Sequence, residues 1–207
     1  LFNRLKNGIS YLKKHPLIFR FGLTSYMLFA FLLVEIHILL PTYVHDFLKR
    51  KGDIYASAEV YYSLGAILAG VFVIHFFRNK NPIFGIILLM LIVSFAFAGM
   101  TFIKSLWYFF IANLILGLTN AGVRILRTTY LFNHIPNNII GRTNSVFNSL
   151  NIMVRMCLIG LFAMPFFLTN DNVRWGYLVG AVMVILAIVP LLLHYKSLVN
   201  LEKKGDI

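Results

Sequence analysis

Residues 83–103 read IFGIILLMLIVSFAFAGMTFI, without a single charged residue. An α-helix needs about 20 apolar residues to cross the hydrocarbon core of a bilayer. A strand of a membrane barrel needs only about ten residues, and these alternate between apolar and polar. Because this run is apolar on every face, it predicts a transmembrane helix rather than a strand.

Five other stretches of the chain have the same length and apolar character. They cover residues 17–40, 56–77, 106–132, 143–168 and 175–195. The composition agrees, since 59% of residues are hydrophobic, 13% are charged and the mean hydropathy is +0.81. Soluble domains are about twice as rich in charge. We therefore expect an all-α polytopic membrane protein, with a six-transmembrane-helix bundle over residues 17–195 and no separate soluble domain.

The two flanking segments are short and basic. Residues 1–16 combine Leu5, Ile9 and Leu12 with several lysines, which predicts an amphipathic helix on the cytoplasmic membrane surface. This helix is either a linker from an upstream part or an ordinary basic anchor. Leu1 leaves open whether the chain is a fragment of a longer protein. Residues 196–207 are expected to form a cytoplasmic tail.

The distribution of Lys and Arg predicts the orientation of the bundle. Six spans place both chain ends on one side of the membrane. Eleven Lys and Arg residues lie in the segments on that side, and five lie in the loops on the other side. Basic loops stay cytoplasmic during insertion, so both termini of this multi-pass protein are expected in the cytoplasm. The lipid bilayer therefore explains the net charge of +12, and no nucleic acid partner is expected.

Small residues recur at helical spacing in the second predicted span. Gly65 and Ala69 are four residues apart, as are Ala66 and Gly70. Each pair shares one helix face and allows a neighbouring backbone to approach closely. Such contacts permit sliding of the helices during a transport cycle, although static packing is the more common role.

Four charged residues interrupt the apolar runs. They are Glu35, Arg124, Arg127 and Arg155. Each costs at least about 2.5 kcal/mol in hydrocarbon, so a role or a partner is expected for each. Glu35 and Arg155 are expected about 21 Å and about 18 Å above the cytoplasmic boundary, at similar depth. Glu35 is interpreted as a residue that takes up and releases a proton, as half of a permanent ion pair with Arg155, or as a side chain that snorkels to the outer interface.

Asn120, Arg124 and Arg127 share one face of the fourth span. This cationic stripe is expected either to bind an anionic group of a substrate, to form an inner gate, or to snorkel toward lipid phosphates. Arg127 lies nearer the end of the span, so it is the better candidate for snorkelling.

Enzyme and pump motifs are missing from the sequence. The six histidines have no metal-ligand spacing, and Cys157 is the single cysteine, which excludes a disulfide within the chain and a cysteine metal cluster. No Walker loop, nucleophile elbow or dinucleotide fingerprint is found. We therefore expect a protein that is not an enzyme, binds no metal or cofactor and takes its energy from a gradient or a partner.

Four segments resemble a known family of transporters. GISYLKKHPL at residues 8–17 resembles the central cytoplasmic linker of major facilitator superfamily exporters, before their seventh helix. LPTYV at 40–44, followed by YSLGAILAG at 62–70, resembles the seventh-to-eighth helix region of the macrolide-efflux and enterobactin-exporter branch. IPNNIIGR at 135–142 resembles the loop of that branch between helices ten and eleven.

The resemblance implies a fold and a function. The chain would be the carboxy-terminal six-helix half of a 12-helix secondary active transporter. It would be an antiporter of a bacterial inner membrane that exports small amphipathic molecules in exchange for protons, by alternating access with the missing amino-terminal half. Gly141 and Arg142 would belong to a gating loop. From the residues alone, a self-contained six-helix channel and a membrane assembly factor remain alternatives.

Two positions depart from the family pattern. The family commonly has an acidic residue and a glycine in the loop after helix eight, where this chain has Arg78, Asn79 and Lys80. The basic residue often found before the Gly-Arg pair is Ile140 here. The resemblance therefore implies a gating role for these loops less strongly than it implies the fold.

Overall fold

The computed structural model describes residues 2–77 and 80–205, and every regular element in these residues is a helix. In chain order they are α1 (Phe2–Lys14), α2 (Pro16–Val34), η1 (Glu35–Leu39), α3 (Leu40–Thr42), η2 (Tyr43–Phe47), α4 (Gly52–Phe77), α5 (Pro82–Phe102), α6 (Leu106–His134), α7 (Asn137–Phe162), α8 (Pro165–Leu168), η3 (Asn170–Val173), α9 (Arg174–Leu193) and α10 (Tyr195–Gly205). The predicted all-α fold is confirmed.

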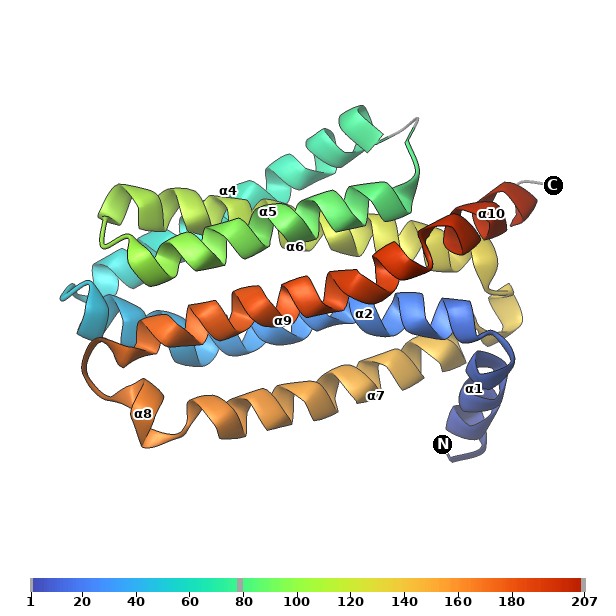
Figure 1. The fold of residues 1–207 in the computed structure, drawn as a ribbon, viewed down its shortest axis with the longest axis horizontal. Helices are drawn as coiled ribbons and strands as arrows, with labels where there is room; N and C mark the ends of the chain where they lie inside the picture. The colour runs from blue at the N-terminus through green and yellow to red at the C-terminus, as the bar shows by residue number, and fades with distance from the viewer. Residues whose placement is uncertain (1, 78–79, 206–207) are drawn as a thin grey trace.

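Six of these helical segments are long and apolar enough to cross a membrane. They are Pro16–Phe47, Gly52–Phe77, Pro82–Phe102, Leu106–His134, Asn137–Phe162 and Asp171–Leu193. The spans run alongside one another along the long axis of the molecule, and both chain termini lie at the same end (Figure 1). The expected six-helix bundle is confirmed.

The first span is longer than predicted. It was expected to end at Leu40, but it continues to Phe47 through two π-helical turns, η1 and η2. Pro41 lacks an amide proton and cannot make a regular helical hydrogen bond. The π turns on either side of it keep the backbone helical, since a π turn accepts one extra residue. The proline therefore changes the helical pattern without ending the span.

The fifth span is shifted toward the amino terminus. It was expected over residues 143–168, whereas α7 runs from Asn137 to Phe162 and Pro165 begins the separate helix α8. The first turns of α7 are too polar for a hydropathy window to include them. They nevertheless form a helix that begins directly after Pro136.

Aromatic rings interlock at the centre of the bundle. Phe31 of α2 meets Phe97 of α5 and Phe162 of α7 edge to face, with ring centroids 4.9 and 6.0 Å apart. Gly180 of α9 faces the ring of Phe31, and a Cβ atom there would lie 2.1 Å from the ring. Tyr43 lies 4.9 Å from Tyr177 between ring centroids. This packing joins α2, α5, α7 and α9.

Two spans are much less covered than the others. Only 24% of the most apolar part of α4 and 28% of that of α7 is buried, against 61% for α5. The two lie on opposite flanks of the bundle, where α4 packs mainly on α6 and α7 packs mainly on α2 and α1 (Figure 1). α4 and α7 therefore each have an open face.

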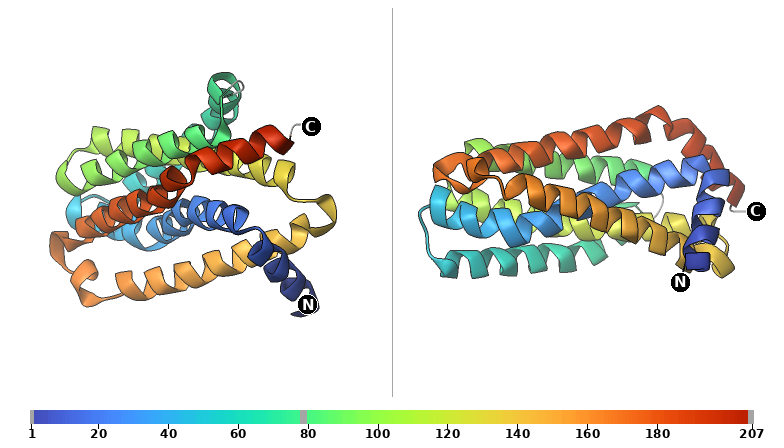
Figure 2. Two further views of the ribbon diagram at one scale, coloured as in Figure 1. Left: turned by 45° about the vertical axis from the view of Figure 1, so that its right-hand side comes forward. Right: turned by 90° about the horizontal axis from the view of Figure 1, so that it is seen from below.

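Short helices cover the end of the bundle that holds the termini. α1 crosses the beginning of α7 (Figure 2), where a Cβ atom on Gly8 would lie 2.7 Å from the carbonyl oxygen of Arg142. Tyr11 of α1 donates a hydrogen bond to the carbonyl of His134, and partial burial raises the pKa of the Tyr11 hydroxyl above its usual range. Tyr130 of α6 donates to the carbonyl of Leu198 and so holds α10.

Candidate functional site

Glu35 lies at the centre of the packed side of the bundle. Its side chain has an exposed fraction of 0%, and the hydroxyl of Tyr177 on α9 donates a hydrogen bond to its Oε1 at 2.8 Å. Its Oε2 is buried and has no hydrogen-bond partner among the described residues. Snorkelling of Glu35 to the outer interface was therefore a wrong alternative, because the carboxyl group faces α9 instead.

Glu35 and His37 of the π turn η1 lie on different sides of the first span. Glu35 is buried against α9, whereas His37 is exposed and lines a groove toward α7. Residues two apart in a helix point to nearly opposite sides, because one turn takes about 3.6 residues. A single turn of the backbone therefore presents a carboxyl group to the core and an imidazole to an open groove.

Arg155 of α7 lines this groove and is half-buried. The groove has a volume of about 370 Å³, and its lining residues are Leu33, Val34, His37, Ile38, Ile152, Arg155, Met156 and Ile159. The predicted ion pair of Glu35 with Arg155 does not form in the described part of the chain, where the ion pairs involve Asp46 and Asp171 instead. Arg155 does lie beside η1 in the groove, whereas the Glu35 carboxyl group contacts Tyr177 of α9.

Arg127 is held inside the bundle. Its exposed fraction is 4%, its Nη1 donates to the carbonyl of Ser25 at 3.0 Å, and its guanidinium lies 3.6 Å from the centre of the Tyr26 ring. The aromatic face and the carbonyl compensate the buried charge. The expectation that Arg127 snorkels to the lipid phosphates is therefore wrong.

The predicted cationic stripe of α6 divides among different neighbours. Asn120 donates a hydrogen bond to the hydroxyl of Tyr62 on α4, and Arg124 is exposed beside it, within electrostatic range of the same hydroxyl. Arg127, one turn further, contacts α2. Arg124 is thus the member of the stripe that an incoming ligand can reach.

Small residues bring α4 and α6 into backbone contact. A Cβ atom on Gly65 would lie 2.0 Å from the carbonyl oxygen of Leu114, and one on Gly117 would lie 1.9 Å from the carbonyl oxygen of Tyr62. Ala69 is buried, whereas a Cβ atom on Gly70 would meet nothing within 4 Å. Of the two predicted pairs, the one of Gly65 and Ala69 therefore lies on the packed side of α4.

The loop residues implied by the resemblance are only partly described. Arg78 and Asn79 lie outside the described residues. Gly141 has open space where a Cβ atom would be, and the side chain of Arg142 is exposed. The gating role of these two residues stays a prediction.

Sequence reasoning missed three residues of the site, Tyr177, His37 and Gly117. Tyr177 follows Gly176 in an otherwise apolar run. A polar hydroxyl in such a run is the signal that could have identified Tyr177 as a site residue. Gly117 and Ala121 are four residues apart and repeat the spacing found in α4. Among the described residues, no three His, Cys, Asp or Glu side chains gather to hold a metal ion.

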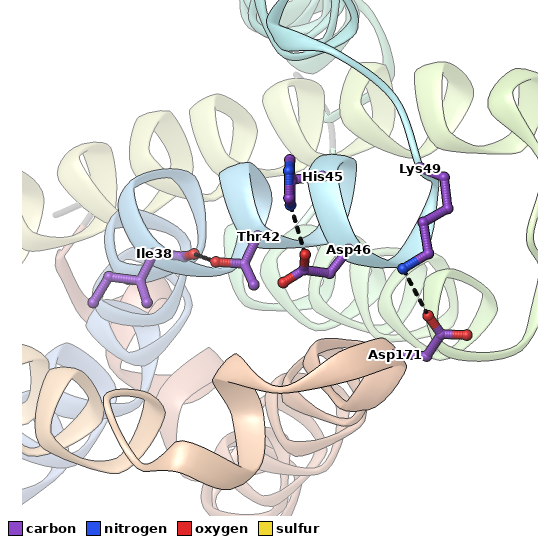
Figure 3. A network of polar contacts seen from close by, with 6 residues as sticks. All are labelled: Ile38, Thr42, His45, Asp46, Lys49 and Asp171. Carbon is purple, nitrogen blue, oxygen red and sulfur yellow. Dashed lines mark hydrogen bonds and ion pairs between the residues drawn. The ribbon is translucent and has the colours of Figure 1, made fainter.

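Polar contacts join the loops at the end of the bundle opposite the termini. His45 and Asp46 lie 2.6 Å apart, and Lys49 lies 4.0 Å from Asp171 across two loops (Figure 3). Asp171 also lies 3.9 Å from Lys104. All of these side chains except that of Asp46 are exposed, and exposed pairs of this kind contribute little to stability. They mark a polar surface beyond the spans.

Comparison with known proteins identifies the family. The family model described as Major Facilitator Superfamily matches residues 2–156, which include Glu35, Arg124, Arg127 and Arg155 and end within α7. No curated protein and no solved structure matches the chain. The family match covers most of the chain and agrees with its six apolar helices, so this multi-pass membrane protein belongs to the Major Facilitator Superfamily of transporters.

Proposed function

We propose that the chain is the carboxy-terminal six-helix half of a secondary active transporter. A second six-helix half would cover the open faces of α4 and α7, whose burial is less than half that of α5. Transport would follow from rocking of the two halves around a site between them. Both termini of this segment would lie in the cytoplasm, and the protein in the cell's inner membrane.

The transported substrates in this proposal are small amphipathic molecules, and their export is driven by protons. The direction and the substrate class rest on the resemblance of residues 40–44, 62–70 and 135–142 to the macrolide-efflux and enterobactin-exporter branch. Transporters of this superfamily are generally not enzymes, and the proposal requires no catalytic step.

Burial of Glu35 is the observation that carries proton coupling. Its carboxyl group is fully buried. One oxygen accepts a hydrogen bond from the Tyr177 hydroxyl, and the other has no partner in the part of the chain that the structure describes. A negative charge in such surroundings is costly unless water or a cation reaches it. Release of the proton therefore requires a structural change that opens the site, and a transporter can couple that change to movement of its substrate.

The π turn offers a place for this change. Residues of η1 connect the buried carboxyl group with the groove toward α7. Single π turns within α-helices often mark functional positions, because a small change of hydrogen bonding redirects the neighbouring side chains. We propose that proton release from Glu35 rearranges this turn and changes the shape of the groove.

The test is uphill export of fluorescent amphipathic dyes from vesicles that contain the full-length protein. A proton gradient should concentrate at least one dye against its gradient, and a protonophore should abolish this accumulation. Movement of dye only down its own gradient, with or without protons, would indicate a channel and contradict the proposal. The absence of any protein-dependent movement would contradict it as well.

A further inference from the structure

We infer that the groove between η1 and α7 is a binding site for small amphipathic anions, and that Arg155 pairs with their negative charge. The inference rests on the proposed transport function and specifies the charge of its substrate. The site would take a molecule with an apolar body and a carboxylate, sulfonate, phosphate or phenolate group.

The groove has the size and lining that such a molecule requires. Its volume of about 370 Å³ lies within the range of about 300 to 1,000 Å³ common for small-molecule sites. Aliphatic and thioether side chains form its walls, and Arg155 and His37 are its polar residues. A mostly apolar pocket with a few polar groups binds the body of a ligand by burial and orients its charged end.

Arg155 lacks the partners that a guanidinium in a membrane span needs. Among the described residues, its Nε atom is buried without a hydrogen-bond partner, and no carboxylate lies within ion-pair distance of its side chain. The Nε atom of Arg127 is unpaired as well, but the Nη1 atom of Arg127 donates to the Ser25 carbonyl and its guanidinium lies on the Tyr26 ring. An unpaired charge in hydrocarbon is costly, so a partner from outside the described residues is expected, and a ligand bound between the two halves would supply it.

The charges at the groove support an anion rather than a cation. Arg155 and His37 line it, whereas Glu35 is fully buried toward α9. No carboxylate is among the described residues that line the groove. An anionic ligand is therefore attracted to the groove, while a cationic ligand is repelled by Arg155.

Binding at equilibrium tests the inference without any transport. The full-length protein, in nanodiscs of zwitterionic lipid and with no proton gradient, is titrated with two fluorescent probes that share one aromatic body. One is 8-anilinonaphthalene-1-sulfonate, which is an anion, and the other is N-phenyl-1-naphthylamine, which is neutral. We expect Arg155→Gln to weaken binding of the sulfonate about tenfold or more, as loss of a charged hydrogen bond predicts, and to leave binding of the amine unchanged.

Two further variants control for charge and for folding. Arg155→Lys keeps the positive charge and should retain most of the affinity for the sulfonate. Arg174→Gln removes a positive charge outside the groove, where the arginine lies near Trp175, and should leave both probes unaffected. Size-exclusion profiles and melting temperatures establish that each variant is folded.

Three results would overturn the inference. They are unchanged sulfonate affinity in folded Arg155→Gln, equal loss of both probes in that variant, and displacement of the sulfonate by anionic lipid in the nanodisc. The last would assign Arg155 to a lipid headgroup. Because the binding assay uses no gradient, the two proposals can fail separately. Sulfonate binding that depends on Arg155, in a protein that shows no proton-driven export, would contradict only the proposed function. Proton-driven export by a protein whose sulfonate affinity is unchanged in Arg155→Gln would contradict only this inference.

Discussion

The two sides of the first span differ in how completely their polar groups are enclosed. Toward α9, Glu35 is fully buried beside Tyr177, and the rings of Tyr43 and Phe97 pack against the ring of Tyr177. Toward α7, the turn η1 borders an open groove, and Met156 on its far wall has an exposed fraction of 68%. The closed side fixes the shape of the bundle, and the open side is free to exchange partners.

The glycines of the bundle follow the same division. Gly65 and Gly180 lie where a neighbouring helix leaves no room for a methyl group, whereas Gly70 and Gly160 have open space around them. Closed and open sides should therefore respond differently to the same substitution. This difference can be tested with pairs of variants that have the same chemistry and opposite surroundings.

The largest effect is expected for Gly65→Ala. The new Cβ atom would lie 2.0 Å from the carbonyl oxygen of Leu114, and a backbone atom cannot move aside. We expect a loss of about 3 kcal/mol in the free energy of unfolding, measured by denaturation in detergent. Gly70→Ala in the same helix should gain up to about 1 kcal/mol from helix propensity. Equal losses in the two variants would contradict the assignment of α4 to one packed and one open side.

Gly180→Ala should cost somewhat less, because its obstacle is a side chain. The Cβ atom would lie 2.1 Å from the ring of Phe31, which has to turn within its contacts to Phe97 and Phe162. We expect a loss of about 2 kcal/mol, visible as a lower melting temperature. Gly160→Ala on the open side of α7 is the control and should not destabilise the protein. A loss in Gly160→Ala as large as that in Gly180→Ala would indicate that the proposed second half packs closely against Gly160.

A smaller effect is expected for Tyr177→Phe. The substitution removes the hydroxyl that donates to Glu35 and leaves both carboxyl oxygens of Glu35 without a donor. A buried acceptor that loses its partner costs about 1 to 2 kcal/mol. Tyr61→Phe removes a hydroxyl that has no hydrogen-bond partner among the described residues, on a ring that stacks on Phe110, and should change stability by less than about 0.5 kcal/mol. Equal stability of the two variants would argue against the Tyr177 contact.

Apolar runs alone were sufficient to predict the number of spans and the helical class. A run such as residues 83–103 has one stable solution in a bilayer, in which every backbone group is bonded within the helix. The charged residues of the candidate site were found for a similar reason, since each is an exception within such a run.

The directions of the charged side chains could not be predicted. The expected meeting of Glu35 with Arg155 rested on their similar depth, and depth does not determine toward which neighbouring helix each side chain points. Arg127 was the better candidate for snorkelling because it lies nearer the end of its span, and the sequence does not show that Tyr26 packs against its guanidinium. Contacts between distant segments depend on helix packing, which the periodicity of one segment does not determine.

Proton coupling at Glu35 is tested most directly by comparing two transport modes in the same vesicles. One mode is uphill accumulation of a dye under a proton gradient, and the other is exchange of labelled for unlabelled dye without a gradient. Glu35→Gln should lose accumulation and retain exchange, because exchange needs no proton release. The matched control Glu59→Gln, which removes an exposed carboxylate of α4, should retain both modes. Uphill accumulation at the wild-type level in Glu35→Gln, or loss of both modes, would contradict the account.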